Sequence, residues 1–325
     1  MTAKDNTGTK RPLIILTGPT AVGKTALSIG LAKAIQGEII SADSMQVYRG
    51  MDIGTAKITK EQMDGVPHHL IDIMDPSDSF HVMAFQQKCK EAMEDIYARH
   101  KIPILVGGTG FYIQSVLYDI SFTETDTDIE YRQKLQKIAE EQGGYVLHAR
   151  LAKIDPEAAD EIHPNNVKRV IRALEFNHQT GEKISIHNEQ ERQKKSPYQF
   201  RYYVLSLPRE ILYDRINRRV DMMRRGGLVD EVKGLLQQGI TPNMVSMQGL
   251  GYKEIIDALQ GSCSFEEAFE RIKRETRHFA KRQFTWFRRE RDVTWIDKET
   301  YENEDAILRY MIEDLKNAHI LPADQ

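Results

Sequence analysis

The stretch Gly18-Pro19-Thr20-Ala21-Val22-Gly23-Lys24-Thr25 decides how the N-terminal part of this chain is interpreted. Its spaced glycines and its Lys-Thr end match the loop whose backbone N–H groups surround a chain of phosphates. The apolar run 12–17 before it predicts a buried strand, and 24–35 after it has the spacing of a helix. Strand, glycine-rich loop and helix in this order are the context the motif requires, which favours a phosphate site over a chance turn.

Apolar segments beyond this loop indicate an α/β fold. We expect further strands at 38–41, 69–73 and 102–106, and a helix over 82–100. Strands that alternate with helices predict a P-loop-type core, in which helices flank a parallel sheet. In such a sheet the ligand site lies at the carboxyl ends of the strands.

The pattern changes at about residue 121, where helical spacing replaces buried strands. We therefore predict an all-helical insertion domain at 121–197, with helices at 129–141, 146–153 and 166–178. The catalytic core then comprises 11–120 and 198–325, after a flexible N-terminus at 1–10. Its C-terminal part is expected to form strands at 200–207 and 293–296, and helices at 209–225, 228–238, 252–259, 264–289 and 303–319.

Composition narrows the class of protein. The chain has 325 residues and a formal net charge of −3, so the molecule as a whole is not basic. Its two cysteines lie far apart in no metal-ligand spacing, which predicts a reducing compartment without disulfides. No apolar run approaches the roughly 20 residues that span a bilayer. The run 13–16 is too short for a signal peptide, so we expect a cytoplasmic protein with no membrane partner.

The loop indicates a phosphate chain but not a nucleoside. In nucleotide triphosphatases an apolar strand ends in an acidic residue that helps to hold Mg²⁺. Here the most apolar strand, 102–106, is followed by Gly107-Gly108-Thr109-Gly110 instead. Asp72 and Asp75 follow the third strand in no clear pattern. This weakens an ATPase assignment without excluding it.

A carboxylate and a polar loop follow the second strand. Asp43, within Ser41–Tyr48, is placed to act as a general base near the phosphates, or it is an ordinary loop carboxylate that caps backbone N–H groups. The loop 50–57 has turn glycines and little periodicity, which favours ligand binding over packing. The glycines at 107–110 permit close approach to a ligand, although a simple turn accounts for them equally well.

Two arginines lie four residues apart on the predicted helix 209–225. Arg215 and Arg219 flank an apolar stripe that includes Ile216 and Val220. Their guanidinium groups can clamp a diphosphate. From this helix alone, a solvated face with extended arginines is the favoured alternative.

The predicted helix 264–289 carries a strong local positive charge. Between Arg271 and Arg291 there are nine Lys or Arg residues against two Glu. Ile272, Phe279 and Trp286 recur every seven residues, which predicts a core stripe. Basic faces with aromatic side chains beside them are typical of nucleic-acid backbone binding, whereas the alternative is an ordinary solvated helix.

These features leave three hypotheses from different classes. The first is a transferase that modifies nucleic acid and takes a small substrate with a diphosphate leaving group. The second is a P-loop kinase of a small molecule, which predicts an adenine pocket and an arginine-rich lid. The third is an RNA-binding nucleotide switch, which predicts an acidic strand end and a base-specificity motif. Neither the kinase features nor the switch features are evident.

The residues resemble a known family over nearly all of 13–295. The motifs are GPTAVGKT (18–25), SADSMQVYRGMDIGTAK (41–57), VPHHLID (66–72), VGGTGFY (106–112), NVKRVIRALE (166–175), QGLGYKE (248–254) and AKRQFTWFR (280–288). In this order they closely resemble bacterial tRNA dimethylallyltransferases of the tRNA isopentenyltransferase family. The insertion at 121–197 resembles the helical extra domain of that family less strictly.

The resemblance implies a reaction and its cofactor. The donor is dimethylallyl diphosphate, held by Gly18, Pro19, Thr20, Ala21, Val22, Gly23, Lys24 and Thr25. The cofactor is Mg²⁺, held in part by Thr25. The acceptor is N6 of the adenine just 3′ of the anticodon in tRNAs that read codons beginning with U. Asp43 matches the general base, and the arginine on the phosphate side is Arg219 or Arg215, with Arg219 favoured.

The resemblance also implies a set of residues that contact the anticodon stem-loop of tRNA. These positions are Asp43, Ser44, Met45, Gln46, Thr109, Arg132, Lys168, Arg169, Val170, Ile171, Arg172, Gln248, Gly249, Leu250, Gly251, Tyr252, Lys253, Lys281, Arg282 and Gln283. Free AMP is the acceptor in related adenylate isopentenyltransferases, and the basic helix and the insertion favour tRNA over it. We expect a monomer.

Overall fold

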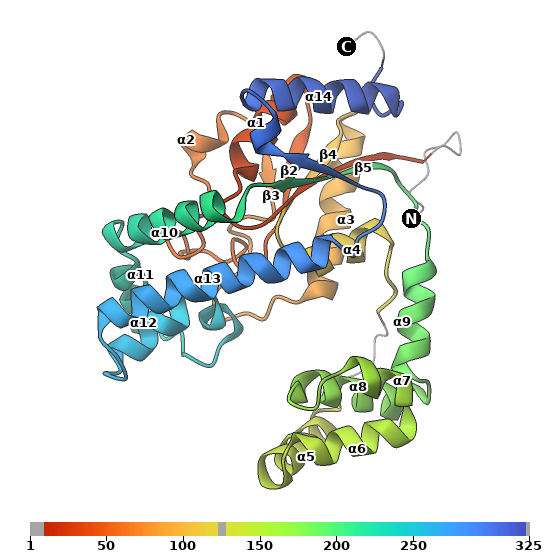
Figure 1. Cartoon of the computed structure of the whole chain (residues 1–325), viewed down its shortest axis with the longest axis vertical. Coiled ribbons are helices and arrows are strands. Elements are labelled where there is room, and N and C mark those ends of the chain that lie inside the picture. The colour runs from red at the N-terminus through yellow and green to blue at the C-terminus, as the bar shows by residue number, and fades with distance from the viewer. Residues whose placement is uncertain (1–9, 123–127, 323–325) are drawn as a thin grey trace. The chain divides into compact units, whose positions relative to one another are not determined.

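A computed structural model describes residues 10–122 and 128–322, which form two compact units (Figure 1). One unit contains the chain up to Leu117 and again from Pro197, and the other contains Tyr118–Ser196. The second unit covers nearly the residues predicted for the insertion, with boundaries shifted by at most three positions. Of the N-terminus predicted to be flexible, 1–9 lie outside the described residues.

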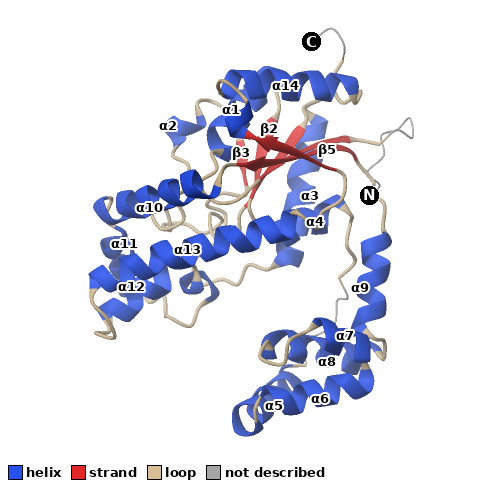
Figure 2. Ribbon diagram, viewed as in Figure 1, coloured by secondary structure: helices blue, strands red, loops and turns tan. Residues whose placement is uncertain are grey.

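The first unit is built on one six-stranded sheet in the order β3-β2-β4-β1-β5-β6 (Figure 2). Every neighbouring pair in it is parallel, which confirms the predicted α/β class with a parallel sheet. The strands are β1 Pro12–Thr17, β2 Glu38–Ala42, β3 His68–His69, β4 Pro103–Gly107, β5 Gln199–Ser206 and β6 Val293–Asp297.

Side chains of β1 alternate between two helical layers, because successive residues of a strand point to opposite faces. Ile14 and Leu16 share a buried cluster with Leu31 of α1 (Lys24–Ile35) and Met311 of α14 (Glu304–Asn317). The helices α3 (Val82–Ala98) and α4 (Gly110–Leu117) pack together against β2 and β4 on the other face. The central strand is therefore covered on both sides, as its unbroken apolar sequence requires.

The third strand is much shorter than predicted. A strand was expected over 69–73, but β3 ends at His69 because Leu70 and Asp72 adopt positive φ angles of 62° and 54°. The N–H groups of Asp72 and Ile73 then bond to the carbonyls of Gln46 and Val47 instead of to a strand. The segment thus joins the loop that follows β2 at the ligand edge of the sheet.

The remaining helices of the first unit include those predicted after 208 and three short ones that were not predicted, α2, η1 and η2. They are α2 Lys60–Met63, α10 Arg209–Arg225, α11 Leu228–Gln237, α12 Tyr252–Leu259 and α13 Phe265–Phe287, with the short 3-10 helices η1 Val245–Gln248 and η2 Lys298–Thr300. None of the helices within 10–122 and 128–322 is long and apolar enough to cross a membrane.

The buried stripe of α13 differs from the predicted one. Ile272 is buried as expected, but Phe279 and Trp286 are only half-buried. Ala280, Gln283 and Phe287 face the core instead. The seven-residue repeat of apolar residues was misleading because the core on this side admits a small side chain and a polar one, for which apolar periodicity gives no signal.

The second unit contains helices and no strand within its described residues. It contains α5 Ile129–Gln142, α6 Gly144–Ile154, α7 Pro156–Glu161, α8 Val167–Thr180 and α9 Ile184–Gln193. Leu135, Leu151, Val170 and Leu174 belong to its own buried cluster. A separate core of this kind allows the unit to be stable on its own contacts.

A buried carboxylate fixes the amino end of β2. Glu38 is only 2% exposed, and its carboxylate meets His69 Nε2 at 2.8 Å, Arg99 Nη2 at 2.7 Å and Lys101 Nζ at 2.9 Å. Burial by itself raises the pKa of Glu38, but hydrogen bonds from these three partners outweigh it and hold the pKa at about 2. Because the folded value lies below the ordinary one, ionised Glu38 stabilises the fold above about pH 5.

Replacing Glu38 with Gln should therefore destabilise the first unit by about 3 kcal/mol at pH 7, since it leaves the surrounding cations without their carboxylate. The difference from the wild type should shrink as the pH falls from about 5 toward 2, because wild-type Glu38 then takes up its proton as well. Urea unfolding followed by tryptophan fluorescence measures this, since both tryptophans, Trp286 and Trp295, lie in the first unit.

Glu94→Gln is the matched control. Glu94 pairs with Arg11 at 2.7 Å but is 44% exposed, so its loss should cost less than about 1 kcal/mol. Equal losses for the two variants, or a loss at Glu38 that does not change with pH, would contradict the assignment.

Candidate active site

Three neighbouring strands bring the candidate residues to one edge of the sheet. Strands β2, β4 and β1 lie side by side, and Gly107 is paired with both Thr17 and Ala42. The phosphate loop follows Thr17, Asp43 follows Ala42, and Thr109 lies two residues after Gly107. The carboxyl edge of the sheet is thus where the phosphate loop and the proposed base meet, as the parallel topology requires.

The loop 18–23 has the backbone conformation of a phosphate site. Gly18, Ala21 and Gly23 have positive φ angles of 144°, 64° and 98°. Lys24 begins α1 and folds back, so that its Nζ donates to the carbonyls of Gly18 and Pro19 at 2.8 Å each. The next side chain, Thr25, is exposed at the amino end of the helix, where anions are favoured.

Lys24 and Arg219 create a positive potential behind the loop. Burial and the nearby charge of Arg219 lower the pKa of Lys24 to about 7, although the Asp43 carboxylate opposes the shift. Burial likewise lowers the pKa of Arg219, again opposed by Asp43. Because burial disfavours both charges and the charge of Arg219 disfavours that of Lys24, an anion bound near these two groups would be strongly favoured.

The two candidate arginines occupy different environments. Arg219 is half-buried, and its Nη2 donates to the Thr55 carbonyl at 3.3 Å. Arg215 is exposed, with Nη1 3.8 Å from the position of a Cβ added to Gly23. Neither lies on a purely solvated face, and Arg219 is the one whose charge acts on both Lys24 and Asp43.

One carboxylate oxygen of Asp43 is held by backbone hydrogen bonds, and the other is available to accept a proton. Its Oδ1 accepts the N–H groups of Met45 at 2.8 Å and Gln46 at 3.3 Å. Within the described ranges, Oδ2 has no hydrogen-bond partner. The loop carboxylate that was the alternative interpretation and the general base are therefore compatible, because the capping contacts aim the second oxygen.

Gln283 clamps the phosphate loop. It is 6% exposed, its Oε1 accepts the N–H of Thr20 and its Nε2 donates to the carbonyl of Gly108, both at 2.9 Å. A Cβ at Gly108 would lie 2.3 Å from Nε2, so only glycine leaves room for this contact. The side chain is thus buried and joins two loops of the site, and the tRNA contact expected at this position stays a prediction.

A cavity of about 440 Å³ opens beside Thr25. Its lining combines the polar side chains of Thr25, Ser41, Gln46 and His68 with the apolar side chains of Ile29, Ile39, Ile58, Ile71 and Val106. Such a lining suits a ligand that has a short hydrocarbon part next to a polar group.

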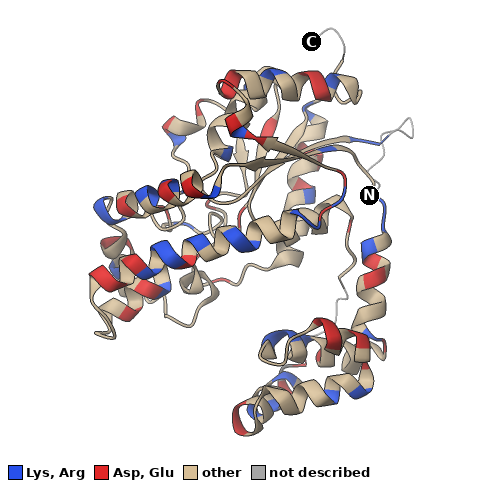
Figure 3. Ribbon diagram, in the orientation of Figure 1, with Lys and Arg blue, Asp and Glu red and all other residues tan. Residues whose placement is uncertain are grey.

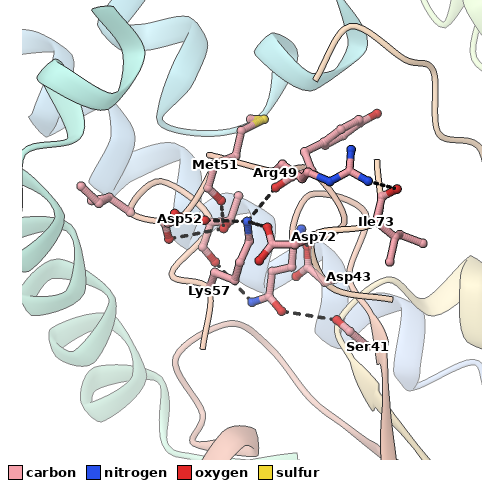
Figure 4. A network of polar contacts seen from close by, with 12 residues as sticks. Ser41, Asp43, Arg49, Met51, Asp52, Lys57, Asp72 and Ile73 are labelled. Atoms are coloured by element: carbon pink, nitrogen blue, oxygen red, sulfur yellow. Dashed lines mark hydrogen bonds and ion pairs between the residues drawn. The ribbon is translucent and has the colours of Figure 1, made fainter. Parts of the chain in front are cut away.

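The loop 50–57 is ordered by the ammonium group of Lys57 (Figure 4). Its Nζ contacts the Tyr48 carbonyl and Asp52 Oδ1 at 2.6 Å and Asp72 Oδ1 at 2.5 Å. Asp75 accepts the N–H and the hydroxyl of Ser77 at 2.9 and 2.7 Å. Both candidate magnesium carboxylates, Asp72 and Asp75, are therefore engaged in local structure.

The segment 248–253 is only partly available to a ligand. Gln248 and Lys253 are exposed, and Gly249 lies against Met45, since an added Cβ there would come 2.6 Å from Cε. Tyr252 is 1% exposed, and its hydroxyl donates to Glu231 at 2.8 Å. The side chain of Tyr252 therefore lies inside the protein, and the tRNA contact expected at this position stays a prediction.

The candidate tRNA residues of the second unit also include both exposed and buried side chains. Lys168, Arg169 and Arg172 are exposed on α8, whereas the side chains of Val170 and Ile171 are buried in the helical core. The tRNA contacts expected at these positions stay predictions. Arg132 is exposed, but its guanidinium group forms two hydrogen bonds of 2.6 and 2.9 Å with the buried Glu175. Only part of its donor set is left for a ligand.

Lys and Arg lie along the middle of α13, and its last turn carries no basic residue (Figure 3). In the first half of the helix, Arg271 pairs with Asp257, and Lys273 pairs with Asp221 at 2.8 Å. Lys281 and Arg282 are exposed and make no ion pair within the part of the chain that the structure describes. These residues stay candidates for contacts with a polyanion.

Sequence reasoning missed three groups near the site. Glu231 of α11 accepts three successive backbone N–H groups from the loop 52–54. The carbonyl of Thr55 accepts from Arg219, and Lys298 of η2 has its Nζ 2.7 Å from a Cβ added to Gly23. Each lies near a group that is far away in the sequence, so no local motif marks it.

A dedicated metal cluster is absent from the described residues, since no group of three or more His, Cys, Asp or Glu side chains could hold an ion. The exposed hydroxyl of Thr25 is placed to supply one ligand to a Mg²⁺ ion. Mg²⁺ commonly completes its coordination with phosphate oxygens and waters, so this donor set fits that ion together with a phosphate ligand.

The fold and the site define an α/β protein of the P-loop type, with a carboxylate and a second cation facing its phosphate loop. The chain belongs to the IPP transferase family, whose model matches residues 46–290.

Relatives and solved structures agree with this assignment. A tRNA dimethylallyltransferase of Lachnoclostridium phytofermentans is 57% identical over 96% of this chain and 99% of its own length. A tRNA dimethylallyltransferase of Bacillus cereus is 51% identical over 93% of this chain and 95% of its own.

Two solved structures share the fold. The tRNA isopentenylpyrophosphate transferase of Bacillus halodurans is 47% identical with a TM-score of 0.70, and the match covers 95% of this chain and 98% of that one. A eukaryotic dimethylallyltransferase acting on tRNA is 32% identical with a TM-score of 0.79, over 97% of this chain and 81% of that one.

The lowered pKa of Lys24 gives a test of the phosphate loop. At pH 8 the free protein should hold Lys24 mostly neutral, and binding of an anion should restore its proton, because the bound charge favours the ammonium form. Calorimetric titration with inorganic diphosphate, in two buffers of different ionisation enthalpy, counts this proton. The wild type should take up nearly one proton more than Lys24→Met at pH 8, and the difference should vanish at pH 6.

Lys33→Met is the control, since Lys33 lies on the same helix but pairs with Asp64. It should behave like the wild type. If Lys24→Met and the wild type take up the same number of protons at pH 8, then Lys24 does not meet the anion as assigned.

Proposed function

We infer that this protein transfers a dimethylallyl group from dimethylallyl diphosphate to tRNA and releases diphosphate. The acceptor is N6 of the adenine just 3′ of the anticodon in tRNAs that read codons beginning with U. Relatives that are 51–57% identical over nearly the whole chain are named for this activity. The observation on this molecule that carries the inference is the meeting of Asp43 with Lys24 and Arg219 at one sheet edge.

On the donor side, the site stabilises a leaving diphosphate. When the allylic C–O bond breaks, its electron pair goes to the diphosphate oxygen. The N–H groups of the loop, together with Lys24 and Arg219, stabilise the negative charge that develops there. Thr25 would hold a Mg²⁺ ion that neutralises part of this charge. The apolar lining of the cavity beside Thr25 suits the five-carbon group, which bears positive charge as the bond breaks.

On the acceptor side, Asp43 removes a proton. The exocyclic amine of adenine is a poor nucleophile because its lone pair is delocalised into the ring. As the new N6–C bond forms, the nitrogen becomes acidic, and Oδ2 of Asp43 accepts its proton. The backbone contacts of Oδ1 fix the carboxylate in the orientation that this transfer needs.

An adenine in an anticodon loop must leave its stack to reach this site. Enzymes that act on a base within a folded nucleic acid commonly extrude it into a pocket. Exposed Lys281 and Arg282 on α13, and Lys168, Arg169 and Arg172 on α8, are the groups that we assign to the tRNA backbone. We propose that the protein acts as a monomer.

A product assay tests this function directly. Purified protein with Mg²⁺ and radiolabelled dimethylallyl diphosphate is given unmodified tRNA, AMP or ATP, and the labelled nucleoside is identified by mass. Label in a tRNA adenosine only is the expected result. Label in AMP alone would indicate that the acceptor is a free nucleotide and not tRNA. ATP hydrolysis without any label would favour the hypothesis of a P-loop kinase or a nucleotide switch.

Asp43→Asn should lower kcat by roughly 10²–10⁴-fold, because the amide cannot accept the N6 proton. An Asn side chain can still accept the N–H groups of Met45 and Gln46, so the loop and the affinity for tRNA should be preserved. Single-turnover rates and filter binding of tRNA measure the two effects. Wild-type turnover in this variant would remove Asp43 from the role of base.

Arg282→Ala should weaken tRNA binding several-fold and reduce the slope of log K against log salt by about 1, the value for one lost phosphate contact. The matched control is Arg309→Ala, which removes an exposed charge from α14, to which no role in tRNA binding is assigned. A slope that is unchanged in Arg282→Ala, or equally reduced in the control, would contradict a specific backbone contact.

A further inference from the structure

The loop 52–54 wraps its backbone around the side chain of Glu231. The N–H groups of Asp52 and Ile53 donate to Oε2 at 2.8 and 2.7 Å, and that of Gly54 donates to Oε1 at 3.0 Å. Three successive N–H groups that converge in this way form an anion-binding concavity. Here a carboxylate of the protein itself, carried on α11, occupies that concavity.

Tyr252 completes this arrangement. Its hydroxyl donates to Glu231 Oε1 at 2.8 Å, so the carboxylate receives four hydrogen bonds and its two oxygens are fully used. Burial raises the pKa of Tyr252, which keeps the phenol in the neutral form that can donate. The ring also packs against Gly54, where an added Cβ would lie 2.5 Å from its carbons.

The residue after this loop segment faces the active site. The carbonyl of Thr55 accepts from Arg219 Nη2 at 3.3 Å and from Gln46 Nε2 at 3.4 Å. Thr55 is itself buried, with its hydroxyl bonded to the Met51 carbonyl at 2.6 Å. Whatever fixes the backbone at 52–54 therefore fixes the acceptor that orients Arg219.

We propose that Glu231, held by Tyr252, is a positioning residue that sets the loop 52–55 so that the Thr55 carbonyl aims Arg219 at the diphosphate. Glu231 itself touches no substrate. The proposal rests on the proposed function for the identity of the donor, but its geometry concerns any diphosphate bound at the phosphate loop. It also gives the buried Tyr252 a role other than contact with tRNA.

Glu231→Gln tests the proposal, because the amide is nearly isosteric but offers one acceptor oxygen in place of two. It should raise KM for dimethylallyl diphosphate about tenfold and leave the Kd for tRNA within about twofold, since only an interaction on the donor side is weakened. Tyr252→Phe keeps the three N–H contacts, so it should raise KM for dimethylallyl diphosphate by only about threefold and also leave the Kd for tRNA nearly unchanged. Asp230→Asn removes an exposed carboxylate one position away and should match the wild type.

A double-mutant cycle separates positioning from a general loss of structure. In an Arg219→Ala background, Glu231→Gln should change KM for the donor by less than about twofold, because the group that it positions is gone. The proposal would be overturned if Glu231→Gln raised KM for the donor by the same factor in the Arg219→Ala background as in the wild type. A loss of tRNA affinity without any change in KM for the donor would also overturn it. If Glu231→Gln does not fold, the same cycle with Tyr252→Phe decides between these outcomes.

Calorimetry with inorganic diphosphate keeps this test independent of the transfer reaction. If the protein proves to use another substrate, diphosphate binding should still be weakened by Glu231→Gln and Tyr252→Phe and preserved in Asp230→Asn. Unchanged diphosphate affinity in both variants would overturn the positioning role even where prenyl transfer is established.

Discussion

The site depends on two cations held close together without an acidic partner of their own. Burial removes water from Lys24 and Arg219, and the charge of Arg219 further lowers the pKa of Lys24. Within the residues that the structure describes, neither side chain forms an ion pair. Backbone carbonyls of Gly18, Pro19 and Thr55 orient them instead. Carbonyl dipoles can direct a cation without neutralising it, so the positive potential is left for a bound anion.

Much of the surrounding structure serves to hold the loops that supply those carbonyls. Gln283 of α13 joins the phosphate loop to the turn after β4. Glu231 of α11 gathers the N–H groups of 52–54. These elements belong to the C-terminal half of the first unit, whereas the loops belong to its N-terminal half. The sheet order, with β1 between β4 and β5, brings the two halves together.

The fixed orientation of these groups also explains how the Asp43 carboxylate can face the site without neutralising its cations. A direct ion pair between Asp43 and Lys24 would neutralise both the base and the cation. In the structure, Asp43 Oδ1 is held by the N–H groups of Met45 and Gln46, so the carboxylate is fixed by the backbone of its own loop. Anion binding and proton acceptance can then occur in one site, which a transfer with a diphosphate leaving group requires.

The sequence by itself determined the parallel α/β core, because apolar strands alternating with helices admit few other arrangements, and the phosphate loop, because its glycines and Lys24 form a local motif. It also marked Asp43, which directly follows a predicted strand. Only the tertiary structure decided that Gln283 and Tyr252 are buried. Gln283 and Thr20, for example, bond across 263 positions of the chain. Such contacts join side chains to distant backbone groups, and neither apolar periodicity nor a local motif records a partner of that kind.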